Sequence, residues 1–157
     1  MKKVALTLAL IAAGLGLNAS AFAESTTGTA QVTILSAITF NEDQIVDFKY
    51  IPSDDGTCSM ASSGVLSGQC AGQPDGTPGQ FTVSGTASQA IDVSVGAGTT
   101  SGGVTYSPLL ASNGATADST TLDGSGNKTV NVIGDLVLAS ATPGAKTLNY
   151  TITVDYQ

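Results

Sequence analysis

The sequence contains no histidine and no tryptophan, its 5 basic residues are all lysine, and only 11% of its 157 residues are charged. Without histidine the chain has no imidazole base, no Ser-His-Asp or Cys-His nucleophile and no histidine-ligated zinc. Without arginine it has no guanidinium fork for phosphate or carboxylate groups. Because 12 acidic residues outnumber the lysines, nucleic acids and anionic membranes are poor partners. We therefore expect neither an enzyme nor a cofactor.

The composition predicts an all-β fold. Glycine accounts for 19 residues, and serine, threonine, valine and alanine are abundant, as is typical of strands joined by many turns. No window shows a long period of 3.6 residues, so almost no helix is expected. The spacing of the strand-like runs predicts a single Ig-like β-sandwich. The predicted strands cover residues 30–34, 38–40, 45–51, 81–84, 91–95, 104–106, 129–133, 136–138 and 148–156.

Residues 1–23 have the three parts of a secretory signal peptide. Two lysines precede an apolar run over residues 4–17, which is followed by Ala21-Phe22-Ala23. The run is shorter than the roughly 20 residues that a spanning helix needs, so we expect no stable membrane insertion. These features predict cleavage after Ala23 and export of residues 24–157 through the periplasm.

Cys58 and Cys70 are predicted to form a disulfide, because paired cysteines in an exported chain are usually oxidised. They lie in the segment Pro52–Gly79, whose glycine, serine and aspartate content predicts a long surface loop. In the chain-entropy model, closing so short a loop stabilises the fold by about 3 kcal/mol. Neither cysteine is part of a Cys-x-x-Cys motif, so a redox role is not expected.

Patterns that resemble catalytic or metal sites fall in predicted turns. The run Ser125–Lys128 matches Ser-x-x-Lys, but no helix is expected there to align the two side chains. Asp123, Ser125 and Asn127 resemble the start of a calcium loop that lacks the distal glutamate, and a hairpin turn is the favoured interpretation. The neighbouring carboxylates of Glu42–Asp43 and Asp54–Asp55 are interpreted as solvated loops. We predict no catalytic residue and no metal site.

The end of the chain has an unusually regular period of two. Apolar side chains alternate with polar ones throughout this last predicted strand, so one face should lie on a core and the other should meet water. No further strand follows it in the sequence to cover its edge. The apolar residues are Leu148, Tyr150, Ile152, Val154 and Tyr156.

The start of the predicted mature chain shows the same alternation. Ala30, Val32 and Ile34 share one parity, and threonine or glutamine stands between them. An apolar strand at a free end is a hazard that proteins normally hide, whereas a chain built to polymerise would keep it. Ile38 and Phe40 share the same parity, which leaves a second interpretation. Residues 30–40 would then form one long first strand inside the domain, and only Glu24–Thr29 would protrude.

The end of the sequence resembles that of chaperone–usher pilins, the subunits of bacterial fimbriae. Pilins of this family end in an alternating strand with a penultimate aromatic residue and a glycine fourteenth from the end, which here are Tyr156 and Gly144. The start resembles the donor strand of the archaic and alternative branches. Nothing between Phe40 and Pro143 matches a family motif, and the short cysteine spacing departs from the usual pilin arrangement.

The resemblance implies an incomplete sandwich that is completed by a donor strand from the next subunit. Residues 24–36 would be the N-terminal donor-strand extension and residues 37–157 the Ig-like pilin domain. The implied partners are further copies of the chain, head to tail in a surface fimbria, and a periplasmic chaperone and an outer-membrane usher in transit. The fibre would support adhesion or biofilm formation. The alternative is a self-contained secreted Ig-like surface or binding domain.

The resemblance also assigns roles to single residues. Ala30, Val32 and Ile34 would be the donor side chains. One wall of the acceptor groove, which is also the edge that faces the chaperone, would comprise Gly144, Leu148, Tyr150, Ile152, Val154 and Tyr156.

Overall fold

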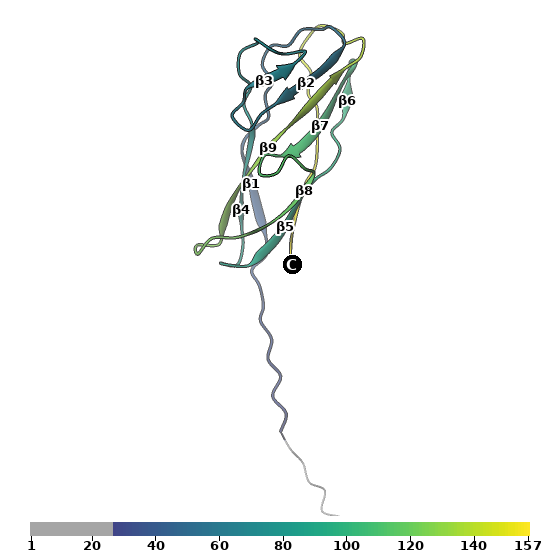
Figure 1. The fold of residues 1–157 in the computed structure, drawn as a ribbon. Coiled ribbons are helices and arrows are strands. Elements are labelled where there is room, and N and C mark those ends of the chain that lie inside the picture. The colour runs from purple at the N-terminus through teal and green to yellow at the C-terminus, as the bar shows by residue number, and fades with distance from the viewer. Residues whose placement is uncertain (1–26) are drawn as a thin grey trace, which may run out of the picture. The chain divides into compact units, whose positions relative to one another are not determined.

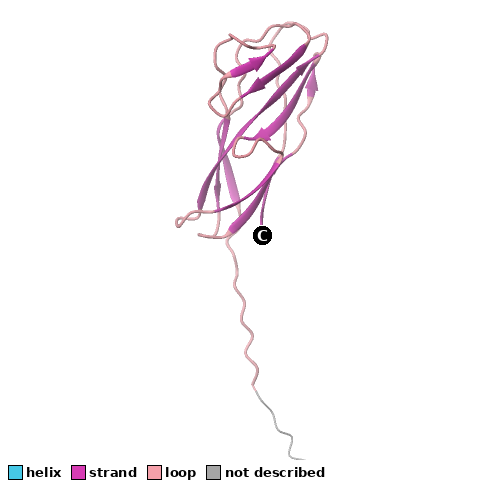
Figure 2. Cartoon of the chain, in the orientation of Figure 1, coloured by secondary structure: helices cyan, strands magenta, loops and turns pink. Residues whose placement is uncertain are grey.

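The structure is a computed structural model that describes residues 27–157, and the predicted signal peptide lies outside the described residues. The chain divides into two units, residues 1–33 and 34–157, and all the strands belong to the second unit. The described part contains no helix (Figures 1 and 2), and so none that could cross a membrane. The strands are β1 (Thr39–Gln44), β2 (Gly56–Met60), β3 (Leu66–Gly68), β4 (Gly79–Ser84), β5 (Ala90–Val95), β6 (Thr100–Ser101), β7 (Val104–Leu110), β8 (Ala117–Thr121), β9 (Asn127–Leu138) and β10 (Ile152–Tyr156).

The strands form two antiparallel sheets, which confirms the predicted all-β sandwich. The larger sheet follows the order β1-β4-β9-β2-β3, with β7 also on β9 and β6 on β7. The smaller sheet has the order β10-β5-β8. The long strand β9 pairs with β4 over residues 127–132 and with β2 over residues 134–138. The sequence predicted two strands here, and one continuous strand carries both pairings.

Two hydrophobic clusters form the core. The first lies on the part of the large sheet that contains β2, β7 and the end of β9, and it includes Phe48 and the half-buried Leu148 from outside the strands. The second lies between the two sheets, where Val83 and Val132 of the large sheet meet Ile91 of the small one. The small sheet thus covers only one end of the large sheet, and irregular segments cover the other.

Aromatic rings connect the two clusters. Tyr150 makes edge-to-face contacts with Tyr106 of the first cluster at 5.5 Å between ring centroids and with Phe81 of the second at 6.3 Å. Phe48 packs on Tyr106 in the same way at 6.0 Å. Such pairs stabilise a core by roughly 0.5–1.5 kcal/mol beyond the area that they bury. Tyr150 therefore packs against both hydrophobic clusters and connects them.

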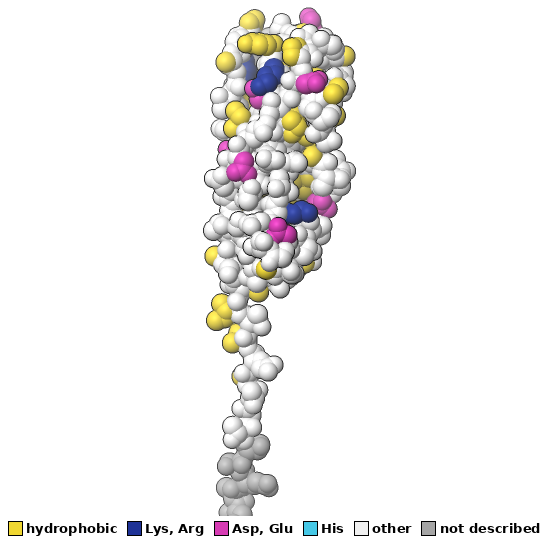
Figure 3. Space-filling view, turned by 90° about the vertical axis from the view of Figure 1, so that its left-hand side faces the viewer, with side chains coloured by type: hydrophobic (Ala, Val, Ile, Leu, Met, Phe, Trp, Pro, Cys, Tyr) yellow, Lys and Arg dark blue, Asp and Glu magenta, His cyan; other side chains and the backbone are white. Residues whose placement is uncertain are grey.

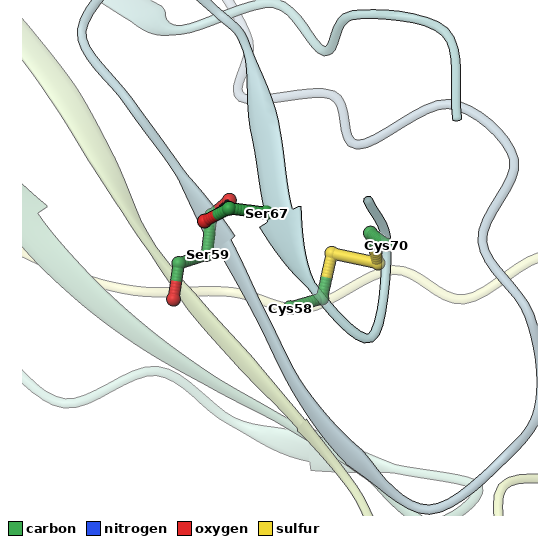
Figure 4. The surroundings of a disulfide bond; sticks show 4 residues. All are labelled: Cys58, Ser59, Ser67 and Cys70. Carbon is green, nitrogen blue, oxygen red and sulfur yellow. Dashed lines mark hydrogen bonds between the residues drawn. A yellow bond between two sulfur atoms is a disulfide. The ribbon is translucent and has the colours of Figure 1, made fainter. Parts of the chain in front are cut away.

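The predicted disulfide is present, but the prediction of a surface loop around it is wrong. The segment Pro52–Gly79 contains β2 and β3, and Cys58 lies on β2 opposite Gly68. Cys70 lies in the turn after β3, and the bridge joins this turn to β2 with 5.1 Å between the Cα atoms (Figure 4). Both cysteines are fully buried in the first cluster. Polar residues between short apolar runs conceal these strands in the sequence.

The predicted strand over residues 30–34 is absent, strand β8 was not predicted, and two other predicted strands differ most in their bounds. Residues 45–51 were expected to be a strand, yet they form only one isolated bridge, between Asp47 and Thr77. The strand here is β1, which precedes them and has a register shift between Glu42 and Gln44. The last strand begins at Ile152, and residues 148–151 bond to the segment after β5 through isolated contacts. The register shift in β1 is a β-bulge, which bends an edge strand and ends its pairing, and the sequence pattern does not show such a bulge.

Candidate strand-addition site

Strand β10 is an edge of the small sheet with an unpaired side. Among the described residues its only partner is β5, and Thr153 of β10 lies opposite Ser94 of β5. The amide of Gly96 donates to the carbonyl of Thr151, and the amide of Gln157 donates to the carbonyl of Ala90. In an antiparallel pair, the residues that bond to the partner alternate with residues whose backbone groups point away from it. The N–H and C=O groups of Ile152, Val154 and Tyr156 therefore face the open edge.

The side chains at the end of the chain alternate as predicted. All five apolar residues of residues 148–156 are half-buried, and the polar residues between them are exposed. Leu148 packs on the first cluster, Ile152 and Val154 pack on the second, and Tyr150 touches both. Gly144 lies apart from them in an exposed turn with φ of 117°, a conformation that favours glycine. The alternation thus gives β10 an apolar inner face beside its open backbone edge.

The facing edge of the large sheet is β1. Phe40 lies opposite the fully buried Val83, so its side chain is on the inner face, and yet it is 53% exposed. Ile38 and Val46, on either side of β1, are half-buried against the second cluster. Strands β1 and β10 belong to different sheets and share no hydrogen-bond ladder. An inner-facing phenylalanine this exposed indicates that this edge of the sandwich is not covered.

We call the region between these two edges the seam. Its β1 side consists of Ile38, Phe40 and Val46, and its β10 side consists of Tyr150, Ile152, Val154 and Tyr156. The sequence predicted the β10 side and missed the β1 side, although the shared parity of Ile38 and Phe40 was a visible signal. The exposed Glu42 also lies on the inner face of β1, opposite the buried Phe81.

The hydroxyl of Tyr150 is buried at the seam without a hydrogen-bond partner among the described residues. Burial, with a smaller contribution from the negative charge of Glu42, raises the pKa of Tyr150 to about 12. Burial also raises the pKa of the neighbouring Tyr106, whose hydroxyl donates to the carbonyl of Ile133 at 2.8 Å. The ring of Tyr150 rather than its hydroxyl therefore fixes this residue in the core.

Tyr156 bonds across one end of the seam. Its hydroxyl donates to the carbonyl of Ser36 at 2.8 Å and accepts the amide of Thr86 at 2.6 Å. The amide of Ser36 in turn donates to the hydroxyl of Thr86 at 2.7 Å. Gly85 leaves room for this arrangement, because a Cβ atom there would collide with the Tyr156 hydroxyl. We call these three hydrogen bonds the Tyr156 latch, which sequence reasoning did not anticipate.

We call residues 27–38, which precede β1, the N-terminal segment. It contains no strand. Val32 and Ile34 are 84% and 87% exposed, and hydrophobic side chains stand free on this part of the chain in the space-filling view (Figure 3). The interpretation as one long first strand over residues 30–40 is wrong, because β1 begins at Thr39. The alternating apolar residues of the segment are therefore available for a partner.

The opposite edge of the sandwich is polar by comparison. A cavity of about 260 Å³ lies there between β8 and β9, and its floor includes Val93 and Val130. Asp118 lies opposite Val93, so it shares the inner face, and Lys128 is on the same face of β9 as Val130. Inward-pointing charges at a sheet edge oppose the addition of an apolar strand. The seam also has an inner-face charge, Glu42 on β1, but that side chain is exposed, whereas Asp118 and Lys128 are half-buried. The edge at β8 and β9 is therefore the poorer acceptor of the two.

The other residues that the sequence suggested for chemistry lie in turns, on β1 or apart from one another. Glu42 and Asp43 were interpreted as a solvated loop, but they are exposed residues of β1. The Asp123 carboxylate accepts the amides of Ser125 and Asn127 at 2.8 and 2.9 Å, and these bonds lower its pKa. It therefore closes a hairpin turn, as favoured above. Lys128 points inward from β9, away from the exposed Ser125. Within residues 27–157, no three His, Cys, Asp or Glu side chains form a group that would hold a metal.

A scan against protein-family models and searches of the curated proteins and of the solved structures found no match to this chain. The seam and the N-terminal segment are therefore the features from which a function can be inferred.

Proposed function

We propose that this protein is a structural subunit of a chaperone–usher fimbria, which polymerises by donor-strand exchange and supports adhesion or biofilm formation. The observation that carries the proposal is a complementary pair of features in one chain. One is the seam, where an open backbone edge borders a half-buried apolar face. The other is an exposed segment with alternating apolar residues.

The two features match in the chemistry of strand addition. An extended peptide that joins a sheet edge gains backbone hydrogen bonds, and its alternate side chains enter the apolar face. The free backbone groups of Ile152, Val154 and Tyr156 would form the ladder. The side chains of Val32 and Ile34 would then cover inner-face residues such as Phe40. Burying each of these two side chains contributes roughly 1.5–3 kcal/mol before any gain from the ladder.

This mode of contact produces a fibre instead of a closed ring. The donor segment and the seam are different surfaces, so the contact between subunits is head to tail. Each subunit that receives a segment still offers its own segment to another subunit. The inward-pointing Asp118 and Lys128 at the opposite edge favour the seam as the single point of addition.

The same surface requires protection before assembly. A chain exported with an open apolar edge aggregates unless a partner covers it. In the proposed pathway a periplasmic chaperone covers the seam in transit, an outer-membrane usher exchanges it for the segment of the next subunit, and the fibre extends from the cell surface.

The test is the behaviour of residues 24–157 purified from the periplasm. We expect ladders of subunit multiples on gels of unheated SDS samples, collapse to one band after heating, and fibres in negative-stain electron microscopy. An excess of a synthetic peptide of residues 24–36 should shorten the ladder, whereas the same peptide with aspartate in place of Val32 and Ile34 should not. A stable monomer that binds no peptide would refute the proposal in favour of a self-contained domain.

A further inference from the structure

The Tyr156 latch joins the two sheets at the end of the seam where the N-terminal segment begins. Tyr156 belongs to the small sheet, Thr86 follows β4 of the large sheet, and Ser36 comes shortly before β1. The latch thus spans the seam at one end. At the other end Val46 and the Tyr150 hydroxyl lie close to Gly79, and within residues 27–157 the Tyr150 hydroxyl makes no hydrogen bond that would join the sheets there.

The position of Ser36 matters because a chain that has both a seam and a donor segment can insert its own segment into its own seam. If the segment entered the seam of its own domain, the domain would be complete and no fibre would grow. The segment directly precedes β1, so such self-insertion requires the chain to reverse direction just before the strand. A reversal in a hairpin takes two to five residues, so the turn would have to be formed by Leu35, Ser36 and Ala37, which lie between Ile34 and Ile38.

The latch occupies the groups that this reversal must move. The amide and the carbonyl of Ser36 are both bonded, to Thr86 and to Tyr156 respectively. A segment inserting into its own seam would also have to enter at the end that the latch spans. Insertion into a second copy requires neither change, because a donor that comes from another subunit is not tied to the latched end and can enter the seam from the other end.

We infer that the Tyr156 latch directs the N-terminal segment to a second copy by opposing its insertion into the seam of its own domain. This inference rests on the proposed function, since it assumes that the segment is the donor. It makes Tyr156 a positioning residue that selects the partner and leaves the apolar contacts of the donor unchanged.

The test compares Tyr156→Phe with wild-type residues 24–157. The variant keeps the ring in the core and removes the hydroxyl, which takes part in two of the three latch bonds. A control, Tyr50→Phe, removes a hydroxyl from a side chain that is 82% exposed and has no part in the latch. The share of monomer after assembly is measured at several protein concentrations, together with hydrogen exchange of the amides of residues 30–34 in that monomer.

We expect Tyr156→Phe to raise the self-inserted monomer about thirtyfold, from the loss of two hydrogen bonds of ordinary net strength. Because self-insertion is intramolecular, this monomer should persist at high protein concentration, and its residues 30–34 should be protected from exchange. Thr86→Val removes the acceptor of the Ser36 amide and should act in the same direction if Tyr156→Phe does not fold.

Ladders of unchanged length in both variants, or a monomer whose residues 30–34 exchange freely, would overturn the inference. If the proposed function itself is wrong, the wild-type chain will form no ladder of subunit multiples on the gel, and this result distinguishes the two failures.

Discussion

Replacing Val32 and Ile34 together with aspartate tests the donor segment most directly. Both side chains are exposed in the single chain, at 84% and 87%, so their replacement costs the isolated domain almost nothing. The change should therefore leave the stability of the domain unaltered and act only on assembly.

The expected size of the effect follows from the apolar area that assembly would bury. At roughly 1.5–3 kcal/mol for each side chain, the pair contributes about 3–6 kcal/mol to the contact between subunits. A factor of ten in affinity corresponds to about 1.4 kcal/mol, so the variant should bind at least about a hundredfold more weakly. Burying the two carboxylates next to the inner-facing Glu42 would weaken it further.

The matched control is Gln31→Asp with Thr33→Asp, which adds the same charge to the polar positions of the segment. Its assembly should change less than tenfold, because these side chains would face away from the core of the acceptor. The assay measures the extent of ladders on gels of unheated samples and the exchange of a labelled peptide of residues 24–36. If both double variants lose assembly equally, the alternation does not determine the contact, and if both assemble normally, the segment is not the donor.

Three further predictions concern the body of the sandwich. Val154→Asp should abolish acceptance of a donor peptide, while the variant still donates its own segment to wild-type subunits. The control is Thr153→Asp, on the exposed face of β10. Full peptide binding by Val154→Asp would show that the seam is not the acceptor site. Replacing Cys58 and Cys70 with serine should lower the free energy of unfolding by about 3 kcal/mol in urea titrations; an unchanged midpoint would show that β2 and β3 need no bridge. The raised pKa of Tyr150, about 12, means that the folded state holds its proton more tightly than the unfolded state, so stability should fall as pH rises from about 10 to about 12. Tyr150→Phe should reduce that fall without loss of stability near neutral pH, because the hydroxyl has no partner in the described chain; a loss at neutral pH would indicate a bonded hydroxyl.

The sequence by itself determined the features that depend on local periodicity. Side chains in a strand alternate between its faces, so the pattern of residues 148–156 predicted which of them are half-buried, including those just before β10 begins. Glycine-rich turns and the lack of helical periodicity predicted the all-β class. The disulfide was predicted from an even number of cysteines in a chain with the pattern of a secretory signal, which itself stays a prediction.

Only the tertiary structure decided which strand edges stay unpaired. That outcome depends on pairings between residues far apart in the chain, and no local pattern encodes them. Phe40 is exposed on an inner face because no strand of the described chain other than β4 pairs with β1. The first cluster buries Cys70 because β3 folds back on β2. The Tyr156 latch joins residues 120 positions apart, because only the fold brings the last strand next to Ser36, just before β1.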